Sequence, residues 1–110
     1  MRGLEFYNIE LNILQEWLEE IAAGNTGQEA AEGVGHFQNQ LLIHHDYING
    51  LKDRIQTNLE EMTREAEEAA GYLKEGNLSN FALLEEQYDT EEKLIKELRK
   101  EFNRFAAKWL

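Results

Sequence analysis

Residues 26–76 read TGQEAAEGVGHFQNQLLIHHDYINGLKDRIQTNLEEMTREAEEAAGYLKEG and contain the longest helical pattern in the chain. Apolar or small residues recur there in steps of three or four: Ala30, Val34, Phe37, Leu41, Ile48, Leu51, Ile55, Leu59, Met62, Ala66, Ala69 and Leu73. His44 fills the one longer step, from Leu41 to Ile48. The mean step is about 3.6 residues, the period of an α-helix. The pattern therefore predicts one continuous helix over about residues 27–75, roughly 70 Å long.

A shorter helix is predicted before this one, over about residues 4–23. Its seam residues follow alternating steps of three and four, as in an antiparallel hairpin or coiled coil: Leu4, Tyr7, Leu11, Leu14, Leu18 and Ile21. A second apolar stripe lies on another face of the same helix and consists of Phe6, Ile9, Ile13 and Trp17. Because one partner helix cannot bury both faces, a third helix or a second subunit is expected to cover the second stripe.

A short turn rich in glycine links these two helices. Thr26 and Glu29 have the spacing of a capping box for the long helix. So short a turn predicts that the two helices are antiparallel neighbours. Counting back from the turn places Trp17 opposite Gly33 and Gly35, where the missing side chains would let the indole approach the long helix closely.

The long helix is expected to end before Gly76, and a third helix is predicted over about residues 79–109. Its apolar face comprises Phe81, Leu84, Tyr88, Ile95, Leu98, Phe102, Phe105 and Trp109. Residues 89–92 have the pattern of another capping box, which predicts a kink there as the alternative to a straight helix. Folding back from Gly76 would bring the basic end of this helix beside an acidic set on the long helix: Asp46, Asp53, Glu60 and Glu61. The first and third helices would then meet end to end near His44.

These elements predict an all-α chain with a single domain, residues 1–110. The expected architecture is an elongated antiparallel three-helix arrangement with a long central helix, which forms a helical-bundle homodimer. The alternative is a compact four-helix bundle with a break at Asn49-Gly50, a dipeptide that often forms turns. The apolar phase continues through Ile48 and Leu51, whereas a turn would reset it, so the continuous helix is favoured.

The composition limits the class of protein. The 110 residues include 42% hydrophobic and 10% aromatic residues, enough for a core, and the chain has a net charge of −11. Such a charge repels phosphate backbones, so no nucleic-acid partner is expected. The sequence shows no signal-peptide pattern, no cysteine and no apolar run long enough to span a membrane. We therefore expect a cytoplasmic protein with no membrane partner.

The candidate metal ligands are His36, His44 and His45, with Glu32 one turn before His36. His36 and His44 are separated by roughly 12 Å along one helix, too far to share an ion. His44 and His45 point about 100° apart. The Glu-x-x-His pair of di-iron bundles is absent. The alternative is that His44 is a hydrogen-bonded core residue in the seam, while His36 and His45 face solvent.

Aromatic residues near the C-terminus are expected to pack beside the middle of the long helix and the start of the first helix. They follow helical spacing and have basic neighbours, as in a segment that docks on a membrane or in a partner groove, although such a stripe is more often core. Together with the second stripe they form the predicted subunit interface: Phe6, Ile9, Ile13, Trp17, Phe102, Phe105 and Trp109.

No catalytic residue and no cofactor are predicted, because the sequence lacks a glycine-rich phosphate loop, a nucleophile elbow and a Ser-His-Asp arrangement. The favoured hypothesis is a non-enzymatic protein–protein interaction module, an adaptor, chaperone-like or structural protein, that acts as a homodimer or higher homo-oligomer. One alternative is a metal-binding helical-bundle sensor or enzyme that uses the histidine cluster. Another is an acidic inhibitor, similar to an antitoxin, that recognises a basic protein by charge complementarity.

Overall fold

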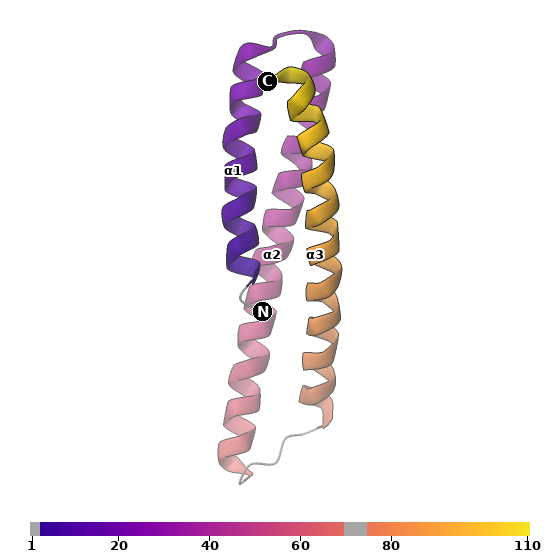
Figure 1. Cartoon of the computed structure of the whole chain (residues 1–110). Helices are drawn as coiled ribbons and strands as arrows, with labels where there is room; N and C mark the ends of the chain where they lie inside the picture. Colours follow the sequence, from indigo (N-terminus) through magenta and orange to yellow (C-terminus); the bar gives the residue numbers. More distant parts are fainter. Residues whose placement is uncertain (1–2, 70–74) are drawn as a thin grey trace.

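The computed structural model describes residues 3–69 and 75–110, which form three helices (Figure 1). These are α1 (Gly3–Gly24), α2 (Gln28–Glu68) and α3 (Glu75–Trp109), and the described residues contain no strand. The molecule is elongated, with extents of 63 × 18 × 17 Å. The predicted all-α class, with three antiparallel helices and a long central one, is confirmed.

The three helices overlap only along part of their length. α1 lies beside α2 as far as just past its middle, where Asn8 Nδ2 donates to Asn49 Oδ1 at 2.9 Å. α3 runs along α2 and reaches the connection between α1 and α2, where Asn25 Nδ2 donates to the carbonyl oxygen of Trp109 at 3.0 Å (Figure 1). All three helices therefore pack together at one end of the molecule, whereas only α2 and α3 pair at the other.

α2 continues without a break through Asn49 and Gly50, so the chain does not adopt the four-helix alternative. Ile48 and Leu51, on either side of this dipeptide, are both fully buried. The apolar seam therefore keeps its phase across the dipeptide, and a turn there would move one of these two side chains out of the core.

The C-terminal end of α2 differs from the prediction. α2 ends at Glu68, and the glycine stop predicted at Gly76 lies inside α3. The seam weakens toward this end, because Met62 and Ala66 are only half-buried and most of their neighbours are exposed and charged. Leu73, the last predicted seam residue, lies outside the described residues.

The earlier end of α2 shifts the register of α3. A return at Gly76 would place the basic end of α3 beside the acidic middle of α2. Instead, Arg99 pairs with Glu10 of α1, and Lys108 pairs with Glu29 at the start of α2. The predicted charge pairing and the end-to-end meeting of the first and third helices are therefore wrong.

The structure also bears on the two capping-box patterns of the sequence. Gly27, rather than Thr26, is the N-cap of α2, with φ −68° and ψ 157°, and no side chain caps this end, so the capping box does not form. α3 has no break near Asp89. The acidic tetrad there stays helical because Glu91, one of its members, is a buried seam residue with 1% exposure.

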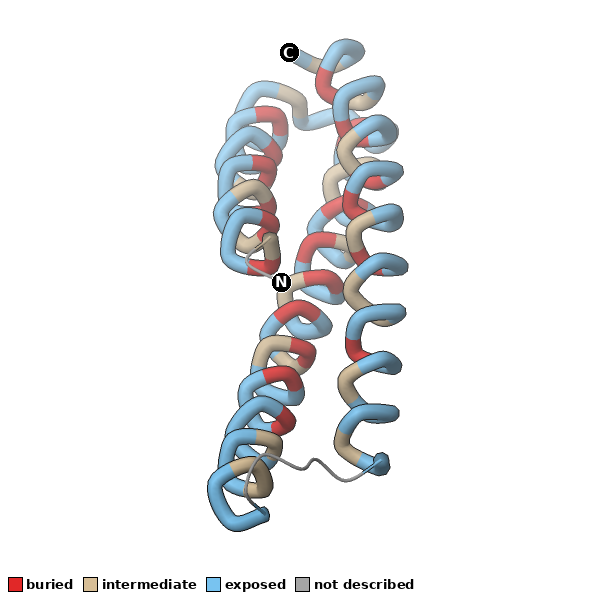
Figure 2. The backbone as a smooth tube through the Cα atoms, turned by 60° about the horizontal axis from the view of Figure 1, so that its bottom comes forward, coloured by how far each residue is buried: buried red, intermediate tan, exposed pale blue. Residues whose placement is uncertain are grey.

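The core is formed by the seam faces of the three helices, which turn toward one another in Figure 2. The predicted seam residues of α1 are all buried: Leu4, Tyr7, Leu11, Leu14, Leu18 and Ile21. α2 contributes Phe37, Leu41, Ile48, Leu51 and Ile55. α3 contributes Leu84, Ile95, Leu98, Phe102 and Ala106. Polar side chains are also buried in this seam: His44, Asn58 and Glu91.

Gly33 makes the close approach that the sequence predicts, but to a different aromatic residue. A Cβ atom at Gly33 would overlap the ring of Phe105 in α3, whereas one at Gly35 would meet nothing within 4 Å. Trp17, the predicted neighbour, is 44% exposed. Glycine at position 33 therefore lets Phe105 pack against the backbone of α2.

Alanine substitutions in α2 should separate helix propensity from packing. Gly50→Ala and Gly35→Ala should each stabilise the chain by up to about 1 kcal/mol, because alanine favours the helix and neither new Cβ atom clashes. Gly33→Ala should destabilise it, because the Phe105 ring must move. Urea unfolding followed by circular dichroism measures the three free energies of unfolding. A stabilising Gly33→Ala or a destabilising Gly50→Ala would contradict the packing described here.

Candidate functional site

The second apolar stripe of α1 is not covered by the rest of the described chain. Its residues Phe6, Ile9, Ile13 and Trp17 are 60%, 57%, 45% and 44% exposed, although the seam on the other side of α1 is buried. Steps of three and four keep the four side chains on one face of the helix. These residues, called the α1 stripe below, form a continuous exposed apolar surface.

Ion pairs on both flanks of α1 fix the direction in which the α1 stripe faces. Toward α3, Arg99 binds Glu10 with two nitrogens, one of them Nη2 at 2.7 Å from Oε2, and this hydrogen bonding raises the pKa of Arg99. Toward α2, Lys52 binds Glu5 and lowers the pKa of that carboxyl. Rolling α1 to bury the stripe against α2 or α3 would expose its buried seam and break both pairs.

A second apolar surface lies on the face of the α2/α3 pair that is turned away from α1. α2 contacts α1 through His45 and Asn49. Tyr47 lies about 200° around the helix from His45, so it is on the side of α2 that faces away from α1. The exposed side chains along this face are Ile43 and Tyr47 of α2 and Leu83 and Leu94 of α3, at 49%, 39%, 51% and 44% exposure. The channel between these four residues is called the α2/α3 groove below.

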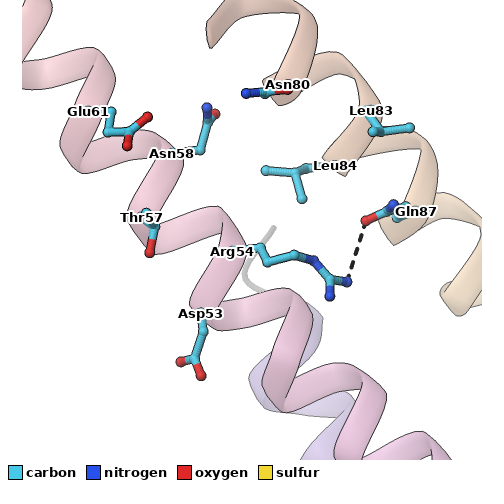
Figure 3. A pocket seen from close by; sticks show the side chains of 9 residues that line it. All are labelled: Asp53, Arg54, Thr57, Asn58, Glu61, Asn80, Leu83, Leu84 and Gln87. Atoms are coloured by element: carbon cyan, nitrogen blue, oxygen red, sulfur yellow. Dashed lines mark hydrogen bonds between the residues drawn. The ribbon is translucent and has the colours of Figure 1, made fainter.

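Two hollows follow each other along the α2/α3 groove. The smaller, of about 240 Å³, is bounded by Ile43, His44, Tyr47, Thr90, Glu91 and Leu94. The larger, of about 390 Å³, lies between residues 53–61 of α2 and residues 80–87 of α3 (Figure 3). Arg54 lies between them: its Nη2 donates to Gln87 Oε1 at 3.5 Å, and its guanidinium carbon is 5.7 Å from the Tyr47 ring centre. The groove thus has an apolar end at Leu94 and a polar end beyond Arg54.

A buried pair, His44 and Glu91, bounds the smaller hollow on its inner side. His44 Nδ1 lies 2.7 and 3.2 Å from the two carboxylate oxygens of Glu91, and the two side chains are 11% and 1% exposed. With Glu91 as a carboxylate, which only accepts, Nδ1 is the donor in this contact. Removing either partner would leave the other polar group buried without a hydrogen bond, so the pair fixes which part of α3 lies beside His44.

Glu91 was not among the predicted site residues, although the sequence contains a signal for it. The apolar face of α3 has a long step from Tyr88 to Ile95, equal to the step that His44 fills in α2. Glu91 falls within that step at helical spacing. Polar residues that fill equal gaps in two facing seams indicate a pair in contact.

The structure does not bring the predicted metal ligands together. His36 and Glu32 are exposed, and His45 Nε2 lies 2.9 Å from Asn12 Oδ1 of α1. His44 is a hydrogen-bonded core residue, as one of the two sequence interpretations predicts. Within residues 3–69 and 75–110, no group of three or more His, Cys, Asp or Glu residues could hold a metal ion.

The aromatic residues at the end of α3 belong to the core. Phe102 is fully buried, with its ring centre 5.4 Å from that of Phe37. Phe105, whose ring centre is 4.9 Å from that of Phe37, and Trp109 are partly buried against the same core. These aromatics therefore lie near the connection between α1 and α2 rather than beside Phe6. The predicted interface is therefore wrong for its three α3 residues, Phe102, Phe105 and Trp109, which pack in or against the core. Its four α1 residues are exposed and form the α1 stripe.

Comparisons with known proteins do not add to these observations. No protein family, curated protein or solved structure matches the chain. In the part of the chain that the structure describes, no helix is long and apolar enough to cross a membrane. The α1 stripe and the α2/α3 groove are the surfaces from which a function can be inferred.

The His44–Glu91 pair should show strong coupling in a double-mutant cycle. His44→Leu and Glu91→Leu should each cost about 3–5 kcal/mol of unfolding free energy, because each leaves a buried polar partner unpaired. The double leucine variant should recover to wild-type stability or above, since a buried pair replaced by apolar residues is often neutral or better. His45→Leu, at a half-buried position, is the control and should cost about 1 kcal/mol or less. If His44→Leu costs no more than His45→Leu in urea unfolding, the structural role of the pair is wrong.

Tyr7 should give the fold a dependence on alkaline pH. Burial raises the pKa of the Tyr7 hydroxyl from its ordinary 10.0 to about 12, and its hydrogen bond to the Glu92 carboxylate adds to the shift. The unfolded chain therefore ionises first, and stability should fall as the pH rises from 10.0 to about 12. Tyr7→Phe should remove this part of the decline, and Tyr47→Phe should retain it. The measurement is urea unfolding at a series of pH values, and equal declines in wild type and Tyr7→Phe would refute the assignment.

Proposed function

We propose that this chain is a non-enzymatic interaction module that acts as a homo-oligomer, with the α1 stripe as the contact between copies. The observation that carries this proposal is the exposure of four large apolar side chains, 44–60% each, along one face of a helix whose other face is fully used by the core. Large contiguous apolar patches of this kind mark interaction surfaces on soluble proteins.

The order of residues in the α1 stripe favours an antiparallel contact between two copies. From either end the stripe reads aromatic, isoleucine, isoleucine, aromatic. A twofold axis perpendicular to α1 would place Phe6 against Trp17 of the partner subunit and Ile9 against Ile13 of the partner subunit. An isologous contact of this type closes into a dimer rather than growing into a filament.

The size of the stripe suits the centre of an interface. Four large side chains at these exposures present on the order of 400 Å² per copy, taking about 200 Å² for a fully exposed large side chain. A stable interface of standard size buries about 800 Å² per partner. The α1 stripe would supply the apolar centre, and polar neighbours on α1 and α3 would supply the rim.

Light scattering over a wide range of concentrations tests this proposal. The wild-type chain should approach twice its mass of 12.8 kDa as the concentration rises. The variant Ile9→Gln/Ile13→Gln should stay monomeric, because it removes the apolar centre without changing the net charge. Leu42→Gln is the matched control, since Leu42 is 60% exposed but lies outside the stripe and the groove. A wild-type chain that remains at 12.8 kDa throughout would rule out the homo-oligomer.

A further inference from the structure

We propose that the α2/α3 groove binds a basic amphipathic helix of another protein, with an apolar stripe on one face and lysine or arginine along its edges. The groove lies on the face of α2 opposite α1. This binding therefore goes beyond the proposed self-association and leaves the α1 stripe free to contact a second copy.

The shape of the groove suits a helix. Two antiparallel helices with exposed apolar side chains one turn apart form a channel into which the apolar face of another helix packs, as in a four-helix bundle. Ile43 and Tyr47 supply such a pair on α2, and Leu83 and Leu94 extend the apolar surface along α3. From residue 43 to residue 61 the groove is about 27 Å long, the length of a helix of about 18 residues.

The rim of the groove is acidic on both sides. Ile43, Leu83 and Leu94 are each followed one turn later by an exposed acidic residue, in order Asp46, Glu86 and Glu97. Asp53 and Glu61 add carboxylates around the larger hollow. The cations next to this rim include Lys93 and Lys100, one turn before and after Glu97, and Arg54, which is already engaged by Gln87 and Tyr47. A helix with basic edges would therefore meet opposite charge along both walls.

The polar end of the groove also contains a hydrogen-bond acceptor that the described residues leave unused. Asn58 is 6% exposed and donates through Nδ2 to the carbonyl oxygen of Asn77 at 3.4 Å, while its Oδ1 accepts no hydrogen bond from the described residues. Figure 3 shows the Asn58 side chain directed toward α3, with Glu61 on the same wall. A lysine side chain entering this hollow could donate to both residues, which favours a basic partner over a purely apolar one.

The charges argue against the α1 stripe of a second copy as the occupant. Ile13 and Trp17 are each followed one turn later by a glutamate, Glu16 and Glu20. Placing α1 of another copy in the groove would add these carboxylates to a rim that is already acidic. Like charges across an interface suppress such a pairing.

A pair of synthetic peptides provides the direct test. The first is a peptide of about 18 residues of leucine and lysine, with the leucines in steps of three and four. The second has the same composition with the leucines scrambled over all faces, so it has the same charge but no apolar stripe. Fluorescence anisotropy should show that the wild-type chain binds the first peptide at least about tenfold more tightly than the second. Equal affinities would mean that net charge alone drives binding and would overturn the proposal, as would no binding.

Matched variants locate the binding site. Leu83→Gln/Leu94→Gln should weaken binding of the amphipathic peptide by about tenfold or more, whereas Leu42→Gln should not. Asp46→Asn/Glu86→Gln should also weaken it, whereas Glu16→Gln/Glu20→Gln, with the same change in net charge, should leave it unchanged. If the groove variants bind like wild type, the proposed site is wrong.

Light scattering on the same variants separates this proposal from the proposed self-association. Leu83→Gln/Leu94→Gln should keep the wild-type mass at every concentration, while Ile9→Gln/Ile13→Gln should keep the wild-type affinity for the peptide. If the groove variant is the one that loses the dimer, the groove is a contact between copies and the basic-helix proposal fails. A monomeric wild type that still binds the amphipathic peptide would refute self-association alone.

Discussion

The buried pair of His44 and Glu91 is the interaction on which the arrangement of α2 and α3 depends. Sliding α3 by one helical turn would place the Glu91 carboxylate against apolar seam residues, and an unpaired buried carboxylate costs several kcal/mol. Apolar side chains are less selective, because similar volumes can pack in more than one register. The pair therefore converts a seam of interchangeable apolar contacts into one defined alignment of the two helices.

The remaining contacts follow from this alignment. It brings Phe102 and Phe105 beside Phe37, and the Phe105 ring then requires a glycine at position 33. It also carries the end of α3 to the connection between α1 and α2, where Asn25 binds a backbone carbonyl oxygen. In this alignment one face of each helix is buried in the core. The apolar surface that remains lies largely on the outer face of α1 and along the side of the α2/α3 pair opposite it.

The periodicity of the sequence predicts well which face of each helix is buried. It predicts poorly how far each helix is shifted along its neighbour. The buried seam of α1 and the unbroken passage of α2 through Asn49-Gly50 were predictable, because both depend only on helical phase. The contact of Phe102 with Phe37 and the neighbour of Gly33 were not, because they depend on how far one helix slides along another. The exposed α1 stripe was foreseeable, since a helix with two apolar faces cannot bury both against its seam partners. The α2/α3 groove was not, because it combines residues of two helices whose alignment is set by Glu91.

The distribution of charge differs between the two apolar surfaces. Three cross-helix ion pairs join the helices on the α1 side of the molecule or near the turn that follows it: Glu5–Lys52, Glu10–Arg99 and Glu29–Lys108. These pairs use cations that are then not available to balance the rim of the α2/α3 groove. At physiological ionic strength the screening length is about 8 Å, so a helix bound there would experience the rim carboxylates rather than the net charge of the whole chain. The acidic rim therefore favours the basic helix that we propose as its partner, whereas on the α3 side of the α1 stripe Glu10 is already neutralised by Arg99.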